Sequence, residues 1–173
     1  MEYKELEVGS INNELFVYFK RHQVVTKCLR KIGNQWCIKD VKFTEDWDAK
    51  NYSKLITCLK RTITKGGVVF GVFIDEKLKG FSSVEADFLG KKKEYLELTS
   101  LHVSEDMRSK GIGKELFNLS KQWAKQHGAC KLYISAHSSI ESQSFYKAMG
   151  CVEALEYAKR HADPYDCQLE YVL

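Results

Sequence analysis

The sequence predicts a mixed α/β fold: a twisted, mostly antiparallel sheet of about seven strands, with helices on both faces and an extra N-terminal hairpin. Apolar runs between residues 68 and 103 follow one another through short connections, which favours antiparallel neighbours. Two longer stretches repeat apolar residues at helical spacing. A strand, a helix and a strand between residues 94 and 136 predict a right-handed crossover and therefore one parallel pair.

The N-terminal third predicts four elements. Residues 3–8 are typical of a strand, and residues 12–20 are typical of a helix because Leu15, Phe16 and Phe19 fall on one face. Residues 24–32 and 35–43 predict a hairpin, since the Gly33-Asn34 pair between them favours a tight turn.

The middle third predicts a helix and three strands. Residues 48–64 repeat apolar side chains at spacings of three and four, and the Gly66-Gly67 pair ends that helix. The strands follow at residues 68–74, 78–88 and 94–103, and their short connections make them neighbours.

The last third predicts two helices and three strands. Residues 114–127 form an amphipathic helix that Gly128 ends, and residues 140–149 form a second helix that Gly150 ends. The strands are expected at residues 131–136, 151–158 and 167–172.

Composition limits the classes of function. A length of 173 residues fits a single domain over residues 1–173. A formal charge of +4, from 27 basic and 23 acidic residues, is too balanced to indicate nucleic-acid binding, and the Lys91-Lys92-Lys93 run is expected to be a solvated hairpin tip. No apolar run reaches the ~20 residues of a membrane span, and the charged start lacks a signal peptide. We therefore expect a cytoplasmic protein with no membrane partner.

The six cysteines predict neither disulfides nor a metal site. None of them forms a C-x-x-C pair, and a protein without an export signal is expected to keep them reduced. A site made of Cys130, Cys151, His161 and Cys167 has spacings that match no compact zinc pattern. Small buried apolar side chains are the expected role, and no metal is expected.

A basic, glycine-containing turn joins the strand at 94–103 to the helix at 114–127. Backbone N–H groups of such a turn and of the helix N-terminus favour a phosphate group, and the basic side chains add positive charge that lysine can extend to a further phosphate. The residues of this turn are Arg108, Ser109, Lys110, Gly111, Ile112, Gly113 and Lys114.

Two other glycine-loop motifs fit this turn poorly. A nucleotide-binding P-loop needs Ser or Thr after the lysine, and Glu115 stands there. A dinucleotide fingerprint needs a third glycine, and Leu116 occupies that place.

The pattern Arg-x-x-Gly-x-Gly, made by Arg108, Gly111 and Gly113, resembles the phosphate loop of the GNAT superfamily of acyl-CoA-dependent N-acetyltransferases. The segment from Ser142 to Cys151 is similar to the superfamily's Ala-x-x-Phe-Tyr-x-x-x-Gly-Phe segment, with Ser and Cys replacing the outer Ala and Phe. The resemblance is strong from about residue 70 to residue 151 and weaker before residue 66.

Side-chain parity in the strand at 94–103 predicts a bulge. Leu96 and Leu98 share one parity and Leu101 and Val103 share the other, so one extra residue near Thr99-Ser100 restores a single apolar face. The alternative is a strand buried on both faces, where parity carries little information.

The resemblance implies where acetyl-CoA, the expected co-substrate, binds. The diphosphate lies on the glycine turn, and the pantetheine arm follows the splayed backbone near Leu101, His102 and Val103. An N–H of Leu101 or His102 stabilises the oxyanion. Ser139 and Ser142 stand where the superfamily contacts the pantetheine arm, although the superfamily more often has Asn and Ala there.

Two residues are the candidate catalytic groups. Tyr146 matches the superfamily tyrosine and is expected to protonate the departing thiolate. Glu97 matches a position where some members carry a catalytic glutamate, and is expected to deprotonate the amine or bind it. His102 and His137 are lesser candidates for proton transfer. Each of these four residues has a structural alternative as an ordinary sheet or helix residue.

The function we expect is acetyl transfer from acetyl-CoA to a primary amine in a ternary complex, with a small-molecule acceptor. A protein or peptide amine and a non-catalytic acyl-CoA sensor are the alternatives, and nucleic-acid binding through the lysine run is a third. The acceptor-facing residues are expected in the N-terminal half and in the Asp163-Pro164-Tyr165-Asp166 loop. Sheet-edge pairing in the superfamily leaves a homodimer open.

Overall fold

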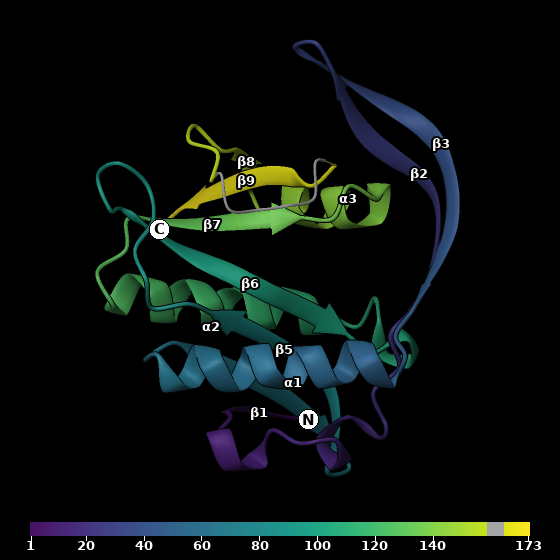
Figure 1. Cartoon of the computed structure of the whole chain (residues 1–173), viewed down its shortest axis with the longest axis vertical. Coiled ribbons are helices and arrows are strands. Elements are labelled where there is room, and N and C mark those ends of the chain that lie inside the picture. The colour runs from purple at the N-terminus through teal and green to yellow at the C-terminus, as the bar shows by residue number, and fades with distance from the viewer. Residues whose placement is uncertain (159–164) are drawn as a thin grey trace.

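The computed structural model describes residues 1–158 and 165–173. Its main sheet has seven strands in the order β1-β4-β5-β6-β7-β9-β8, and β2 and β3 form a separate two-stranded sheet (Figure 1). Every adjacent pair is antiparallel except β6 and β7. The strands are β1 (Glu2–Glu5), β2 (His22–Ile32), β3 (Gln35–Asp46), β4 (Val68–Ile74), β5 (Lys77–Val84), β6 (Tyr95–Val103), β7 (Lys131–Ala136), β8 (Val152–Glu153) and β9 (Cys167–Val172).

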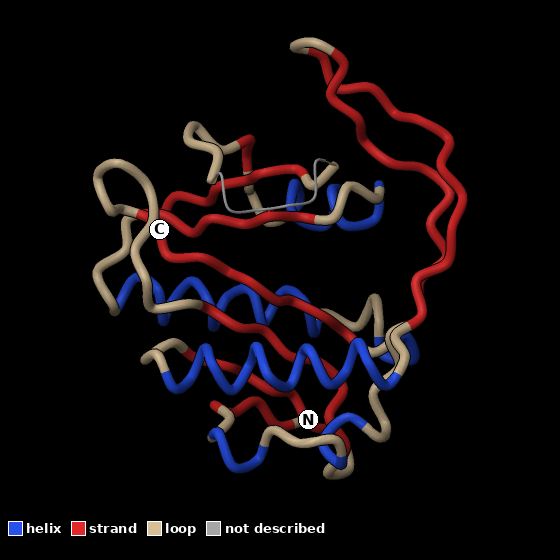
Figure 2. Tube along the Cα trace, in the orientation of Figure 1, coloured by secondary structure: helices blue, strands red, loops and turns tan. Residues whose placement is uncertain are grey.

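Three α-helices cover the two faces of the main sheet (Figure 2). They are α1 (Ala49–Thr64), α2 (Ile112–Gln126) and α3 (Ile140–Ala148). Leu59 of α1 belongs to one apolar cluster with Val69 and Phe81 of the sheet. Side chains of α2 and α3 belong to a second cluster with residues of β7 and with the residues of β4 that alternate with Val69. This second cluster therefore lies on the other face of the sheet. The predicted mixed sheet with helices on both faces is therefore confirmed.

The helix predicted at 48–64 forms because both of its ends are capped. The Asp48 carboxylate accepts from the Asn51 N–H at 2.8 Å, and the Asn51 side chain accepts from the Asp48 N–H at 3.0 Å. This reciprocal pair is a capping box. Gly66 follows the last turn with φ at +87°, the left-handed conformation that glycine adopts without strain.

The helix predicted at 12–20 is wrong. Two short 3₁₀ turns, η1 (Val8–Ser10) and η2 (Glu14–Phe16), stand in this region instead. Tertiary contacts use the backbone at the end of this segment: the Lys20 N–H, which an α-helix would direct to the Phe16 carbonyl, donates to Ser104 Oγ at 3.0 Å, and the Phe19 carbonyl accepts from the Tyr52 hydroxyl at 2.9 Å. Phe16 and Phe19 are still buried, as their spacing indicates.

The strand predicted at 151–158 is mostly wrong, since only Val152–Glu153 pairs as a strand. The Leu155 N–H donates to the Glu170 carboxylate at 3.0 Å, and the Ala158 N–H donates to Gln168 Oε1 at 2.9 Å. Side-chain oxygens thus accept the bonds that the backbone of a partner strand would otherwise accept. The strand predicted at 78–88 is also shorter, ending at Val84.

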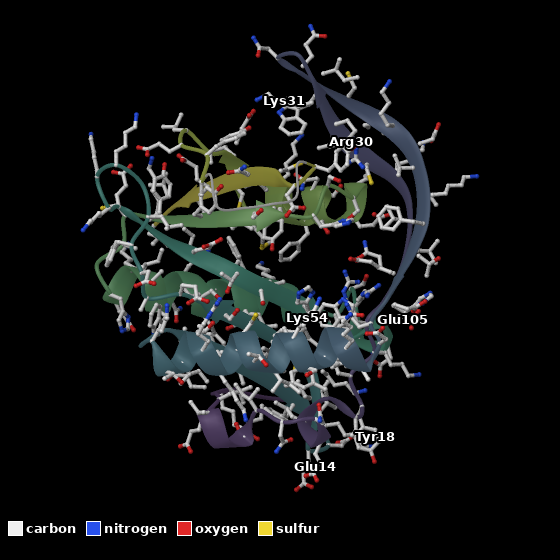
Figure 3. All side chains as sticks on the ribbon, in the orientation of Figure 1. Glu14, Tyr18, Arg30, Lys31, Lys54 and Glu105 are labelled. Carbon is white, nitrogen blue, oxygen red and sulfur yellow. The ribbon has the colours of Figure 1, made fainter. Side chains whose placement is uncertain are left out.

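The hairpin predicted at residues 24–43 is confirmed and extends to His22–Asp46. It curves along one side of the molecule, from the start of α1 past the level of β9 and α3, and its turn lies at the top of the view (Figure 1). Arg30 and Lys31 lie on its inner side (Figure 3). The Leu29 N–H donates to the Ser138 carbonyl at 2.8 Å, and Lys31 pairs with Glu153 of β8. The hairpin is therefore fastened at its far end as well as at its base.

No helix among the described residues is long and apolar enough to cross a membrane.

Candidate active site

The predicted bulge in β6 is confirmed, and Thr99 is the extra residue. Ser83 of β5 pairs with Ser100, whereas the next residue, Val84, pairs with Leu98. Leu98 on one side of the bulge and Leu101 on the other consequently contact the same apolar cluster. The bulge changes the direction of β6 immediately before the strand reaches the site.

Beyond the bulge, β6 and β7 separate. They pair in parallel at three positions, from Tyr95 with Lys131 to Glu97 with Tyr133. β7 goes on to pair with β9 as far as Ala136, on its other side. Residues 98–103 of β6 therefore present a backbone edge toward a gap rather than toward a strand.

A cavity of about 820 Å³ occupies this gap. Its wall is made by the end of β6, the turn before α2, the end of β7, the start of α3 and the base of the hairpin. Of the residues predicted to bind acetyl-CoA or act on it, those that line the cavity are Leu101, His102, Val103, Arg108, Ser109, Gly111, Ile112, Gly113, Lys114, His137, Ser142 and Tyr146. Residues distant in the sequence are thus brought to one place.

The turn before α2 has the conformation of an anion site. Ser109 and Gly111 both have positive φ, at +62° and +82°, and α2 starts directly after Gly111. The first bond into the helix is donated by the Glu115 N–H to the Gly111 carbonyl. The N–H groups of residues 112–114 precede that bond and have no intrahelical partner, which is the geometry that suits a phosphate.

Gly113 allows α2 to approach α3 closely. A Cβ placed at this residue would lie 3.2 Å from Cε2 of Phe145, which is tighter than ordinary van der Waals contact. The N-terminus of α2 therefore stands against the helix that carries Tyr146.

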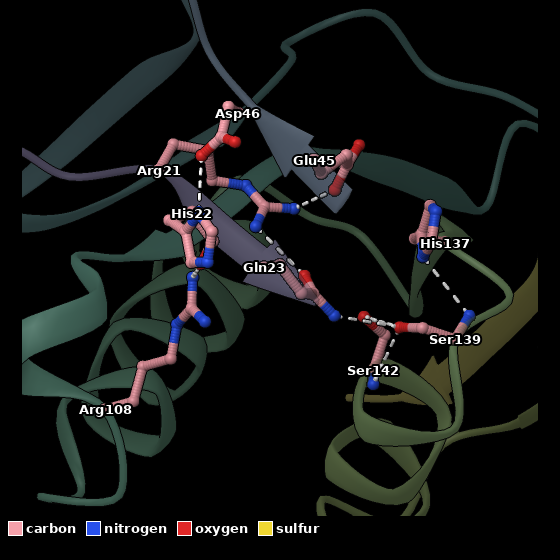
Figure 4. A network of polar contacts seen from close by, with 9 residues as sticks. All are labelled: Arg21, His22, Gln23, Glu45, Asp46, Arg108, His137, Ser139 and Ser142. Carbon is pink, nitrogen blue, oxygen red and sulfur yellow. Dashed lines mark hydrogen bonds and ion pairs between the residues drawn. The ribbon is translucent and has the colours of Figure 1, made fainter. Parts of the chain in front are cut away.

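The basic side chains of the turn point in different directions. The Arg108 guanidinium donates to the His22 backbone carbonyl at 2.6 Å, so it reaches the base of the hairpin (Figure 4). Lys110 is exposed, does not line the cavity, and has its Nζ 3.5 Å from Met107 Sδ. Lys114 does line the cavity.

Tyr146 lies on α3 with only 8% of its surface exposed. Phe145 and Phe117 surround its ring, with ring centres 5.1 and 6.2 Å away. Burial raises the pKa of the phenol, with a smaller contribution from neighbouring Cys151. The hydroxyl therefore keeps its proton at neutral pH, as a general acid must.

Glu97 lies at the closed end of the gap. Its side chain is 1% exposed, and it stands in the last parallel pair of β6 with β7, next to Tyr133. Its carbonyl accepts from the Glu85 N–H at 2.9 Å. Glu97 is not among the cavity-lining residues, so its role as a base stays a prediction.

His102 faces the cavity from the bulged end of β6. Trp47 and Phe81 flank its ring, with ring centres 4.8 and 5.3 Å away. Burial, followed by the positive charges of Arg21 and Arg108, lowers the pKa of His102 to about 3. A neutral imidazole with so low a pKa is a weak base at physiological pH.

Ser139 and Ser142 form the cap of α3. Ser139 Oγ accepts from the Ser142 N–H at 3.4 Å and donates to Ser142 Oγ at 3.0 Å. Gln23 of the hairpin donates to the same Ser139 oxygen at 3.3 Å (Figure 4). Ser139 is fully buried and does not line the cavity, whereas Ser142 does.

Sequence reasoning placed the acceptor-facing residues in the N-terminal half but left the hairpin's role open and named none of its residues. Arg21, Gln23 and Val24 line the cavity opposite the phosphate turn. A polar Arg-His-Gln triplet before an apolar run was the available signal, but nothing local indicates which part of the chain it faces. Asp166 also lines the cavity and its Oδ2 accepts from Ser135 at 3.0 Å, while Asp163, Pro164 and His161 lie outside the described residues.

Several solved structures of acetyltransferases are similar to this chain. The chain has the fold of a putative streptothricin acetyltransferase from Bacillus anthracis str. Ames, solved with acetyl coenzyme A, at a TM-score of 0.74 and 17% identity over 99% of this chain and 98% of that one. A nourseothricin acetyltransferase matches at 0.66 and 17% over 98% and 95%. A ribosomal-protein-alanine N-acetyltransferase from Brucella melitensis matches at 0.61 and 13% over all of both chains.

A search of curated proteins finds no significant match. The family model for the acetyltransferase (GNAT) family matches residues 35–151, which hold the bulge, the phosphate turn and Tyr146. The chain therefore belongs to the acetyltransferase (GNAT) family and is an acetyl-CoA-dependent acetyltransferase.

Proposed function

We propose that this enzyme transfers an acetyl group from acetyl-CoA directly to a primary amine of a small molecule, with both substrates bound at once. One observation carries the proposal: a single cavity connects the phosphate turn, the open edge of β6, Tyr146 and the base of the hairpin. Two substrates that enter from opposite ends of such a cavity meet without a covalent enzyme intermediate.

Different walls of the cavity would bind different parts of acetyl-CoA. The turn at residues 108–114 would hold the diphosphate, and the edge of β6 from Leu101 to Val103 would bond the amides of the pantetheine arm. A backbone N–H of Leu101 or His102 would stabilise the negative charge that develops on the thioester oxygen. Ser142 lies on the adjoining wall and would contact the same arm.

In the reaction the amine nitrogen attacks the thioester carbon, and the carbon–sulfur bond then breaks. The sulfur leaves with the bonding electrons, and the Tyr146 hydroxyl supplies a proton to it. The amine loses its proton to solvent or, through water, to a carboxylate. Glu97 is our candidate for that carboxylate, because it lies where β6 and β7 begin to separate.

The hairpin favours a small acceptor. It is fastened at both ends, by Arg108 at its base and by Ser138 and Glu153 further along, and so it encloses the side of the cavity that an extended peptide would need. Two structural neighbours, which are named streptothricin and nourseothricin acetyltransferases, support a small acceptor too. We place the reaction in the cytoplasm.

A protein amine is the alternative acceptor, and the Brucella melitensis neighbour is the observation in its favour. The test is a screen of small amines and of peptides with free N-termini, with acetyl-CoA present and release of free thiol recorded. Thiol release with small amines supports the proposal. Release with peptides alone would overturn the acceptor class, and binding of acetyl-CoA without any release would favour a sensor.

A further inference from the structure

Arg21 is a buried cation in the cavity wall opposite the phosphate turn. It stands directly before β2 and its side chain is only 9% exposed. The residues nearest in sequence that also line the cavity are Gln23 and Val24. A buried guanidinium remains charged and needs hydrogen-bond acceptors around it.

The described neighbours supply only part of that need. Arg21 Nη2 donates to Glu45 Oε2 at 2.5 Å and Nη1 donates to Gln23 Oε1 at 2.9 Å (Figure 4). Its Nε–H is buried and has no acceptor among the described residues. A buried donor without an acceptor is destabilising, so a bound molecule that supplied an acceptor would stabilise this group.

The charge around Arg21 also lacks balance on the cavity side. Burial lowers the pKa of Arg21 most and the positive charge of Arg108 lowers it further, and burial followed by both guanidiniums lowers the pKa of His102 in the cavity wall. Glu45, the carboxylate bonded to Arg21, does not line the cavity. The carboxylates that do, Glu141 and Asp166, come from the start of α3 and the segment before β9, and Asp166 accepts from Ser135 there.

We propose that Arg21 binds a carboxylate on the acceptor, which makes the acceptor an amino acid or another small amine that carries a carboxylate. A planar carboxylate fits the forked donors of a guanidinium. It would give the Nε–H its acceptor and would offset the paired positive charges beside His102. This inference rests on the proposed function, since it names the acceptor class for the same reaction.

The experiment compares acceptors that differ only in the carboxylate. Amino acids of several chain lengths are assayed beside their amides and their decarboxylated amines, with acetyl-CoA saturating and thiol release recorded. We expect the carboxylated members to have kcat/KM values about tenfold or more above their partners, because a site built to bond a group discriminates against the analogue without it.

Arg21→Gln should lower kcat/KM for the carboxylated acceptors by about 10- to 100-fold, and for the amides by less than about threefold. Arg21→Lys should recover part of the loss, because it restores charge without the fork. Lys20→Gln is the matched control. It removes an adjacent exposed cation that lines a neighbouring cavity and not this one, so it should leave the preference unchanged.

A binding measurement separates this inference from the proposed function. A short carboxylic acid without an amine, titrated at pH 7 into the enzyme with CoA bound, should bind to the wild type, shift the NMR resonances of the His102 ring, and bind at least about tenfold more weakly to Arg21→Gln. If the enzyme binds the carboxylic acid in this way but acetylates no amine, the proposed function alone would be wrong. Turnover without preference for the carboxylate, or binding unaffected by Arg21→Gln, would overturn the role of Arg21. If Arg21→Gln fails to fold, the wild-type preference and the shift of the His102 resonances still decide.

Discussion

The Arg108 guanidinium donates a 2.6 Å hydrogen bond to the backbone carbonyl of His22, across 86 positions of sequence. Arg108 opens the phosphate turn, and His22 opens the hairpin that walls the other side of the cavity. The two walls of the cavity are therefore joined directly, and a change in one should affect the other.

Arg108→Ala should weaken the binding of both substrates. Loss of a hydrogen bond to a charged group costs about 1.5–3 kcal/mol, and we expect the free energy of unfolding to fall by about that amount. The KM values for acetyl-CoA and for the acceptor should rise together, as steady-state kinetics with each substrate varied would record. Lys110→Ala, which removes an exposed cation of the same turn, should leave the acceptor KM unchanged. A rise in only the acetyl-CoA KM in Arg108→Ala would contradict the coupling.

Tyr146→Phe should lower kcat by about 100-fold or more, which is the contribution typical of a general acid. Binding of acetyl-CoA should stay within about twofold, because the ring remains packed between Phe117 and Phe145. Burial raises the pKa of this phenol, so the wild-type rate should show no loss of a Tyr146 proton at neutral pH. Equal turnover in the variant and the wild type would remove Tyr146 from the mechanism.

Gly113→Ala should push α2 away from α3. The new methyl group would meet the Phe145 ring at 3.2 Å, and overpacking of this kind costs about 1–3 kcal/mol, against which alanine gains about 0.5–1 kcal/mol over glycine within a helix. We expect a melting temperature close to that of the wild type and weaker acetyl-CoA binding by calorimetry, since the helix start belongs to the turn at residues 108–114. Gly9→Ala is the control, because nothing lies within 4 Å of a Cβ there. Coenzyme affinity equal to the wild type would argue against a role for this contact.

His102 should make the protein less stable in mild acid. Burial and the two arginines hold its pKa near 3 in the folded state, against 6.5 when unfolded. The unfolded chain therefore binds one more proton between these values, so this contribution to stability is present above about pH 6.5 and is lost as pH falls toward 3. Urea unfolding of the wild type and of His102→Gln at pH 7 and pH 4.5 checks this. The variant should show a shallower loss, and parallel losses in both proteins would refute it.

Glu153→Gln should loosen the far end of the hairpin. Bonds from Lys31, Trp36 and Tyr157 lower the pKa of Glu153 to about 2, which marks a carboxylate that the folded state holds ionised. This stabilisation is present above about pH 4.5 and is lost as pH falls toward 2. Limited proteolysis should then cut the Gly33-Asn34 turn faster in the variant. Asp40→Asn removes an exposed charge from the same hairpin and should be cut at the wild-type rate.

Much of the cavity wall that β6 and the turn before α2 form could be predicted from the sequence, because its signals are local. The parity slip between Leu98 and Leu101 predicted the bulge, and the spacing of Gly111 and Gly113 predicted a turn followed by a helix start. Phe16 and Phe19 show the limit of such patterns. Their spacing indicated burial correctly and the wrong secondary structure, since bonds from Tyr52 and to Ser104 decide the backbone there.

The acceptor side could not be predicted in the same way. The place of Arg21 in the cavity depends on contacts between segments about a hundred residues apart, such as Gln23 with Ser139. The two-residue parity of a strand indicates which side chains share a face, and leaves open which distant element that face meets.

The hairpin shares no strand with the main sheet, and apart from its contact with residues 138–139 its two strands pair only with each other. Its length, curvature and side chains can therefore vary during evolution without breaking the strand pairing of the main sheet. Related enzymes that keep the same acetyl donor can in this way change the molecules they modify by altering this one hairpin.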